Sequence, residues 1–146
     1  MNTLLINPSP KTLAIVFESG DEVMAGLRQV SLEYKLAASH FTAIGAFQEV
    51  TLGFFDLATK QYQKTIFREQ LEVLSLIGDV SLEDADPQIH AHVVVGKSDS
   101  STSGGHLIHG IVRPTLEVVL TESPAHLHRK FNSEFGLALL DLKDSS

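Results

Sequence analysis

Histidines are the residues of this sequence best suited to chemistry. The chain of 146 residues contains seven, and His90 and His92 stand two positions apart in an apolar run at residues 89–95. Such a run predicts a β-strand, in which alternate side chains leave the same face. The two imidazoles should therefore project together, with Cα atoms ~7 Å apart, close enough to bind one metal ion.

A third histidine can reach the same face. Residues 96–105 are rich in Gly, Ser and Asp and predict a loop, and His106 lies as far beyond Asp99 as His92 lies before it. In a hairpin centred on Asp99 these two histidines are cross-strand partners. Three imidazoles with open positions for water or substrate suit zinc, iron, nickel or another divalent transition-metal ion. We predict that His90, His92 and His106 bind such a cofactor, with zinc the first expectation.

Other interpretations of these histidines stay open. Buried histidines often bond only to the backbone, and a His-x-His pair can arise by chance. A cupin metal motif would need a glutamate shortly after the second histidine, where the sequence has Val95, Gly96 and Lys97. His109 falls three positions after His106, so alternation places it on the opposite face.

A second His-x-His pair, His126 and His128, follows Pro124 and precedes Arg129-Lys130. This setting predicts a surface segment rather than a ligand set.

Glu72 is the acidic residue that could support the metal ligands. It shares strand parity with Leu74 and Leu76, which predicts an apolar surrounding. A carboxylate there needs a partner, either an arginine (Arg68 or Arg113) or the metal itself. We favour a structural ion pair over a catalytic base.

Composition excludes several classes of function. Without cysteine the chain forms no disulfide, zinc finger, iron–sulfur cluster or catalytic thiol. Its 11 basic and 18 acidic residues give a net charge of −7, which disfavours direct binding to a phosphate backbone. No apolar run approaches the ~18 residues of a membrane-spanning helix, and the N-terminus lacks the basic region of a secretory signal. We expect a globular, cytoplasmic protein that does not enter membranes.

The elements that must position the histidines are mostly strands. One helical stripe begins at Glu22 and extends to Ala38. Apolar runs separated by turn signals predict the strands, and the tail at 131–142 predicts a last strand or a short helix. The expected strands are 12–17, 41–48, 51–57, 61–67, 70–77, 89–95, 107–112 and 115–121, with loops at 7–10, 81–87 and 96–105. The pattern predicts a single α+β domain over residues 1–146, a mostly antiparallel sheet with one main helix.

Several of these strands are apolar on both faces, notably residues 71–77, 93–95 and 116–120. One helix cannot cover a large sheet, so the second face predicts contact with another subunit. Coverage by irregular segments of the same chain is the alternative.

Short motifs in a fixed order resemble a known family. They are Gly45-Ala46-Phe47, residues 52–56 (LGFFD), 70–78 (QLEVLSLIG), 89–92 (IHAH), 104–107 (GGHL) and 115–119 (TLEVV). Together they resemble the plants and prokaryotes conserved (PPC) domain, a domain of unknown function. The resemblance covers residues 12–122 and leaves 123–146 as a C-terminal tail element.

The resemblance implies a fold and two functions. It implies an antiparallel sheet flanked by helices, assembled as a homotrimer, with a metal site that maps onto His90, His92 and His106. In plant members the domain follows AT-hooks and mediates self-association, from which bacterial relatives take a DNA-binding description. The Arg-Gly-Arg-Pro core of an AT-hook is missing here. We therefore expect a metal-binding homotrimer whose reaction and small-molecule ligand stay open; a self-associating interaction module is the alternative.

Overall fold

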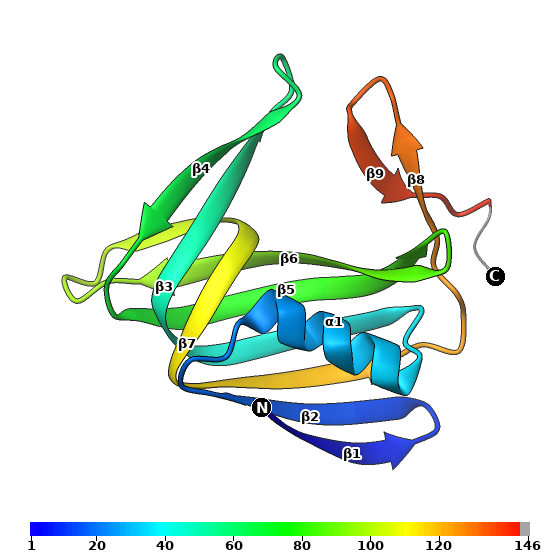
Figure 1. Ribbon diagram of the computed structural model, residues 1–146, viewed down its shortest axis with the longest axis horizontal. Coiled ribbons are helices and arrows are strands. Elements are labelled where there is room, and N and C mark those ends of the chain that lie inside the picture. The colour runs from blue at the N-terminus through cyan, green and yellow to red at the C-terminus, as the bar shows by residue number, and fades with distance from the viewer. Residues whose placement is uncertain (144–146) are drawn as a thin grey trace.

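The computed structural model describes residues 1–143 and, for residues 3–8, the backbone only. It contains one helix and nine strands among those residues (Figure 1). In chain order they are β1 (Asn2–Pro8), β2 (Lys11–Glu18), α1 (Val23–Tyr34), β3 (Ser39–Asp56), β4 (Gln61–Phe67), β5 (Leu71–Glu83), β6 (Asp86–Gly96), β7 (Thr102–Glu122), β8 (Arg129–Asn132) and β9 (Leu137–Leu140). The mostly antiparallel sheet and the single main helix are confirmed.

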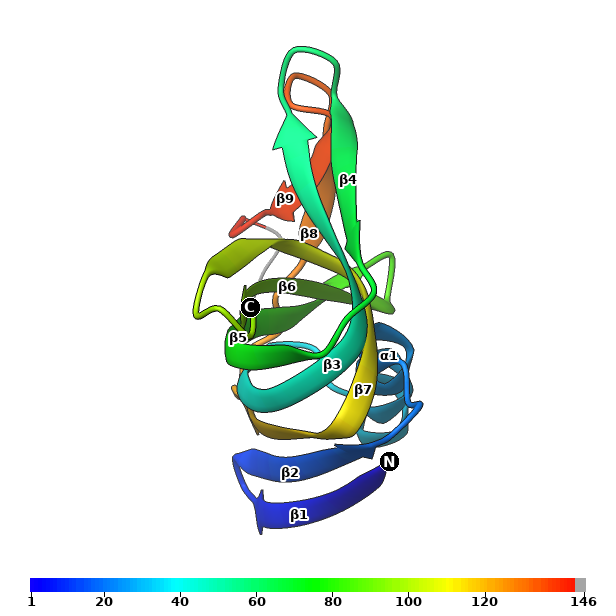
Figure 2. The ribbon, with the colours of Figure 1, turned by 90° about the vertical axis from the view of Figure 1, so that its left-hand side faces the viewer.

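Seven strands form one antiparallel sheet in the order β1-β2-β7-β6-β5-β3-β4. Because β3 pairs with both β5 and β7, the strands β3, β5, β6 and β7 close into a ring, which Figure 2 shows in cross-section. Helix α1 packs against β6 and β7. Inward-facing side chains of the strands and the helix form the core, whose largest members are Phe17, Phe41 and Phe47.

Helix α1 is shorter than the sequence pattern predicts. Its buried stripe includes Val23, Leu27 and Val30, and the side chain of Glu22 accepts a hydrogen bond from the Ala25 amide at the N-terminus. The helix ends at Tyr34 because Lys35 adopts a left-handed conformation, with φ of 53°. The expected extension to Ala38 is therefore wrong.

Strands β3 and β7 are each longer than predicted. The pairs of strands expected at 41–48 and 51–57, and at 107–112 and 115–121, are single strands of 18 and 21 residues that bend at bulges. The expected loop at 81–87 shrinks to a turn at Asp84 and Ala85, both with positive φ, and the 96–105 loop shrinks to residues 97–101. Part of the loop expected at 7–10 belongs to β1, a strand the sequence did not predict.

Two hairpins rise from the same side of the ring (Figure 1). One is the outer part of β3 with β4, here called the β3–β4 arm (residues 52–66). The other is β8 with β9, here called the C-terminal hairpin (residues 129–140), which settles the tail as strand rather than helix. Within residues 1–143, no helix combines the length and apolar character needed to cross a membrane.

Candidate metal centre

The three predicted histidines meet on the face of the sheet between the two hairpins. His90 and His92 leave the same side of β6, and His106 on β7 pairs directly with His92, so the predicted register is confirmed. The ring centroids lie 5.1 Å apart for His90 and His92, 5.4 Å for His90 and His106, and 5.5 Å for His92 and His106. One ring nitrogen from each lies within 4.8 Å of the others. Such spacing lets three imidazoles converge on one ion after small side-chain rotations.

The surroundings of His106 keep its ring neutral. It is half-buried and stacks on Tyr62, with centroids 4.8 Å apart. Burial, with smaller contributions from His90 and His92, lowers the pKa of His106 to about 4. Burial and His90 also lower the pKa of His92. Both rings therefore hold free lone pairs at neutral pH, as metal ligands must.

His106 also has an unsatisfied atom. Its Nδ1 is buried and has no hydrogen-bond partner in the described part of the chain. A buried polar nitrogen is costly unless water or an ion supplies a partner. A donor set made only of imidazole nitrogens fits a divalent transition-metal ion.

Asp79, which sequence reasoning missed, orients His90. It lies opposite His90 on β5, with Oδ2 3.5 Å from His90 Nδ1. Arg129 Nη2 lies 2.8 Å and 3.1 Å from the two oxygens of Asp79 and 3.4 Å from His90 Nδ1. Burial opposes ionisation of Asp79, but the hydrogen bonds from His90 and Arg129 outweigh it and lower its pKa. With Nδ1 held on the carboxylate, Nε2 of His90 is left for a metal.

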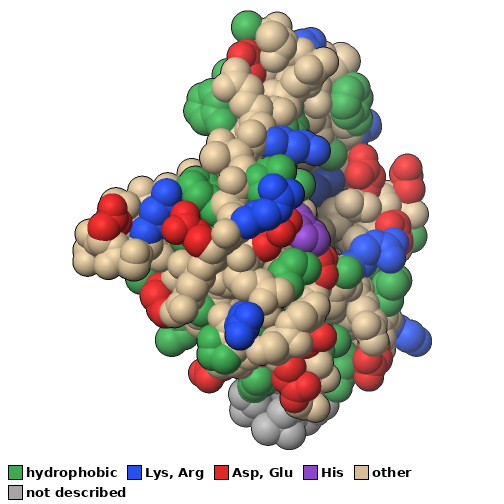
Figure 3. Space-filling model, turned by 60° about the vertical axis from the view of Figure 1, so that its left-hand side comes forward, with side chains coloured by type: hydrophobic (Ala, Val, Ile, Leu, Met, Phe, Trp, Pro, Cys, Tyr) green, Lys and Arg blue, Asp and Glu red, His purple; other side chains and the backbone are tan. Residues whose placement is uncertain are grey.

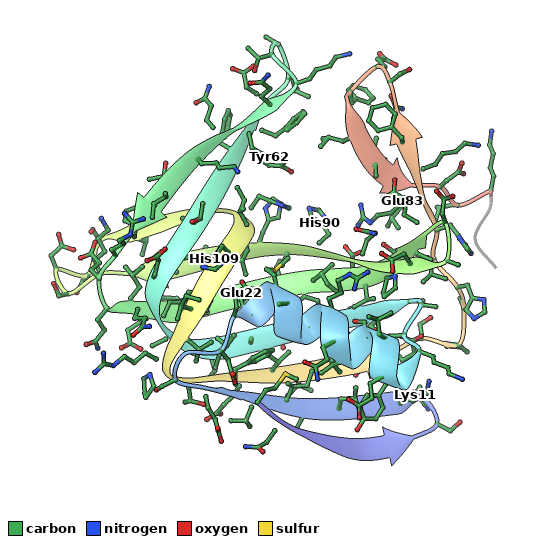
Figure 4. All side chains as sticks on the ribbon, viewed as in Figure 1. Lys11, Glu22, Tyr62, Glu83, His90 and His109 are labelled. Atoms are coloured by element: carbon green, nitrogen blue, oxygen red, sulfur yellow. The ribbon has the colours of Figure 1, made fainter. Side chains whose placement is uncertain are left out.

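The histidines separate two hollows. The first, about 190 Å³, lies between the two hairpins and is lined by Tyr62, Glu83, Gln88, Ile89, His90, His106, Arg129 and residues 137–139. Figure 4 shows Tyr62 and His90 facing this space from the β3–β4 arm and from β6. In the space-filling view a histidine is visible at the bottom of the hollow beneath the arm (Figure 3). The side chain of Glu83 forms no hydrogen bond or ion pair with any described residue.

The second hollow lies on the other side of the histidines. It lies over the outer face of the sheet, which is the face that carries the exposed side chains of Ile44, Ile77 and Val94. It measures about 500 Å³ and is lined by His40, Phe41, Thr42, Ile77, Gly78, Asp79, His90 and His92. His90 thus borders both hollows, whereas His106 borders the first and His92 the second.

Glu72 does not lie where its sequence parity predicts. Its side chain is exposed, and its strand neighbours are Gly96 and Ala46, away from the histidines. A bulge between Val73 and Ser75 reverses the alternation, so Glu72 does not share the buried face of Leu76. Its expected apolar surrounding is therefore wrong. Asp79 is the carboxylate beside the three histidines. The register of the β5–β6 hairpin, about its turn at residues 84–85, is the signal that could have identified it.

The remaining histidines lie outside the group. His109 Nδ1 is 3.4 Å from Glu22 Oε1, at the start of α1, as expected for a residue on the opposite face. His126 is exposed, as predicted. His128, the other member of the second His-x-His pair, is half-buried. Arg129, which follows the pair, has a side chain that is only 9% exposed because it contacts Asp79.

Comparison with known proteins supports a shared architecture. The family model for the Plants and Prokaryotes Conserved (PCC) domain matches residues 7–124. A candidate DNA-binding protein from Bacteroides thetaiotaomicron superposes with a TM-score of 0.88 at 30% identity, over 90% of this chain and 92% of that one. A metal-containing protein from Archaeoglobus fulgidus gives 0.82 at 34% identity, over 90% and 93%. A plant- and prokaryote-conserved protein from Pyrococcus horikoshii gives 0.84 at 28% identity, over 96% and 94%. No protein of curated function matches the sequence.

Proposed function

Because the chain belongs to the Plants and Prokaryotes Conserved domain family, we propose that it is a metal-binding protein with one divalent transition-metal ion per chain. His90, His92 and His106 are the ligands, and zinc is the first candidate, ahead of iron and nickel. The observation that carries the proposal is the convergence of three ring nitrogens within 4.8 Å. The metal-containing relative from Archaeoglobus fulgidus supports it.

A three-histidine site leaves coordination positions open. A metal held in this way polarises a bound carbonyl or lowers the pKa of a bound water towards ~7. The chain's own residues prepare the site for this. Burial keeps His106 unprotonated, Asp79 holds His90 in one orientation, and Tyr62 fixes the ring plane of His106. The first hollow gives a small molecule access to the open positions. The reaction itself is left open.

Elemental analysis of tag-free protein tests this proposal. Protein loaded with zinc and dialysed should retain one ion per chain, measured by plasma mass spectrometry. His92→Ala should lose it, since His92 is the most exposed of the three ligands and its removal leaves the core packing intact. His126→Ala, which removes an exposed histidine outside the group, should keep it. A wild-type protein without retained metal would overturn the proposal.

A second candidate function is self-association, and the outer face of the sheet favours it. Val16, Ile44, Ile77, Val94 and Val119 lie on adjacent strands of that face, each between 38% and 62% exposed. The exposed Glu117 interrupts this surface between Val16 and Ile44, since it is the cross-strand partner of both. Exposed apolar side chains on neighbouring strands nevertheless typically mark a protein contact. We propose that it mediates assembly as a homotrimer and that any role at DNA passes through protein partners. A salt-sensitive complex with A·T-rich duplex in a gel shift would contradict the last point.

A further inference from the structure

The C-terminal hairpin lies outside the part of the chain that the family model matches, yet it forms one wall of the first hollow. The match ends at residue 124, and β8 begins at Arg129. Residues 137–139 of β9 line the hollow opposite Tyr62 of the β3–β4 arm. Figure 1 shows the two hairpins standing on either side of the space above β6. A molecule that reaches His106 through this hollow therefore passes between the β3–β4 arm and the C-terminal hairpin. Of these two, only the arm belongs to the part of the chain that the family model matches.

Arg129 fastens the base of this hairpin to the sheet. Its Nε donates to Ser81 Oγ at 2.7 Å, its Nη2 to Asp79 at 2.8 Å, and its Nη1 to the Ala138 carbonyl at 3.1 Å. One side chain thus joins β5, β8 and β9 on the floor of the hollow. Backbone bonds from Leu82 to Leu127, at 2.8 Å, and from Leu127 to Ala37, at 3.0 Å, fix the chain just before it.

The tip of the hairpin is held by the opposite arm. Lys60, in the turn between β3 and β4, donates from Nζ to the Ser133 carbonyl at 2.7 Å. Its methylene chain passes so close to Gly136 that a Cβ there would lie 3.0 Å from Lys60 Cδ. The two hairpins therefore form an arch over His90 and His106, tied at the base by Arg129 and at the top by Lys60.

We propose that the C-terminal hairpin is the element that controls access of small molecules to the histidine site, and that Arg129 is its positioning residue. Three observations carry this: the shared lining of the hollow, the three-way anchoring by Arg129, and the tie at Lys60. The hollow of about 190 Å³ is below the ~300–1,000 Å³ of pockets for drug-sized ligands. It therefore selects small molecules. This inference rests on the proposed function in one respect: the proposed metal ion is what a small molecule would contact after it enters the hollow.

Chemical modification of metal-free protein tests the proposal independently of metal. Diethyl pyrocarbonate carbethoxylates accessible neutral imidazoles, and peptide mass spectrometry gives a rate for each histidine. His106 reports access through the arch, because it lines only the first hollow. His92 reports access from the outer face, because it lines only the second. At one fixed pH, the ratio of the two rates cancels differences in reagent concentration.

Two variants should move this ratio in opposite directions. Arg129→Ala should raise it roughly tenfold, since losing hydrogen bonds from a charged group shifts a docking equilibrium by about that factor. Ala138→Phe should lower it, since the larger ring fills the hollow while the Ala138 backbone contact is kept. Leu140→Phe, a substitution in the same strand at a residue outside the lining, should leave it unchanged.

The outcomes separate this inference from the proposed function. A purely structural role for Arg129 would lower the melting temperature and raise the reactivity of all histidines alike, which would overturn the inference. An unchanged ratio in Ala138→Phe would also overturn it, whether or not Arg129→Ala folds. Metal content, measured on the same preparations, decides the proposed function by itself.

Discussion

At the scale of single residues, the three histidines have different surroundings although they share one face. His106 is packed against Tyr62, His90 contacts the Asp79–Arg129 pair, and His92 is exposed. Residues that share a task but differ in burial should respond differently to pH and to substitution. Two predictions use this difference.

The first concerns acid stability of the metal-free protein. His106 has an ordinary pKa of 6.5, and burial lowers it to about 4 in the folded chain. Between these values the unfolded state binds more protons, so the stabilising contribution is complete above pH 6.5 and is lost as the pH falls towards 4. We expect the free energy of unfolding in urea to decrease from pH 7 to pH 5. His106→Asn should flatten that decrease, and His126→Asn, at an exposed position, should not. Equal slopes in all three proteins would contradict this account.

The second concerns Asp79. Removing the carboxylate that orients a metal-binding histidine typically weakens metal affinity by about 10–100-fold. We expect Asp79→Asn to weaken zinc binding by this order, measured by competition with a chromophoric chelator. The matched control is Asp86→Asn, which removes a carboxylate from a surface pair with Arg28 at 2.7 Å. If both variants bind zinc as tightly as the wild type, Asp79 has no part in the site.

Much of the site was predictable at this scale, and its supporting residues were not. The grouping of the three histidines follows from parity on one strand and symmetry about Asp99, both of which are local. Placing Asp79 beside His90 needs the register of the β5–β6 hairpin. The turn of that hairpin, at Asp84 and Ala85, lies inside the longer loop that the sequence predicts at 81–87. Arg129 required knowledge of where the tail folds back, which no local pattern contains. Glu72 was misplaced because a bulge is invisible in an alternating sequence.

At the scale of elements, the bending of β3 and β7 closes the ring that carries the histidines. Gly45 sits at the bend with φ of 150°, and a Cβ there would overlap the Thr115 carbonyl oxygen and lie 2.7 Å from Leu116 Cα. The sequence predicted two separate strands here, at 41–48 and 51–57, the first of which contains this glycine. In the structure the strand continues through it, because glycine lets two backbones approach where any side chain would separate them.

Gly45→Ala should therefore be strongly destabilising. A non-glycine residue in this backbone conformation costs about 1–3 kcal/mol, and the overlap with β7 adds to that cost. Gly20→Ala is the matched control, because Gly20 has φ of 94° but nothing within 4 Å of the added Cβ. Urea unfolding should show a larger loss for Gly45→Ala than for Gly20→Ala. Similar losses would mean that the close approach has no energetic consequence.

At the scale of the whole molecule, the candidate metal site borders the apolar outer face. His92 is the strand neighbour of Ile77, and Val94 follows it on the same side of β6. A second subunit placed over Ile77 and Val94 would therefore cover the second hollow and leave the first one open, beneath the arch of hairpins. The subunit interface would then lie on one side of the three histidines, and the route for small molecules would lie on the other.

The proposed trimer gives the last prediction. Ile44 is 62% exposed on the outer face, so replacing it with lysine removes apolar contact without disturbing the core. We expect the wild-type protein to sediment as a trimer and Ile44→Lys as a monomer with unchanged circular dichroism. Ile66→Lys, at a 49% exposed position on the β3–β4 arm, changes charge and apolar area in the same way but lies off that face, so it should remain trimeric. A monomeric wild type at micromolar concentration would remove the assembly proposal, and dissociation of both variants would show that the interface extends over the arm.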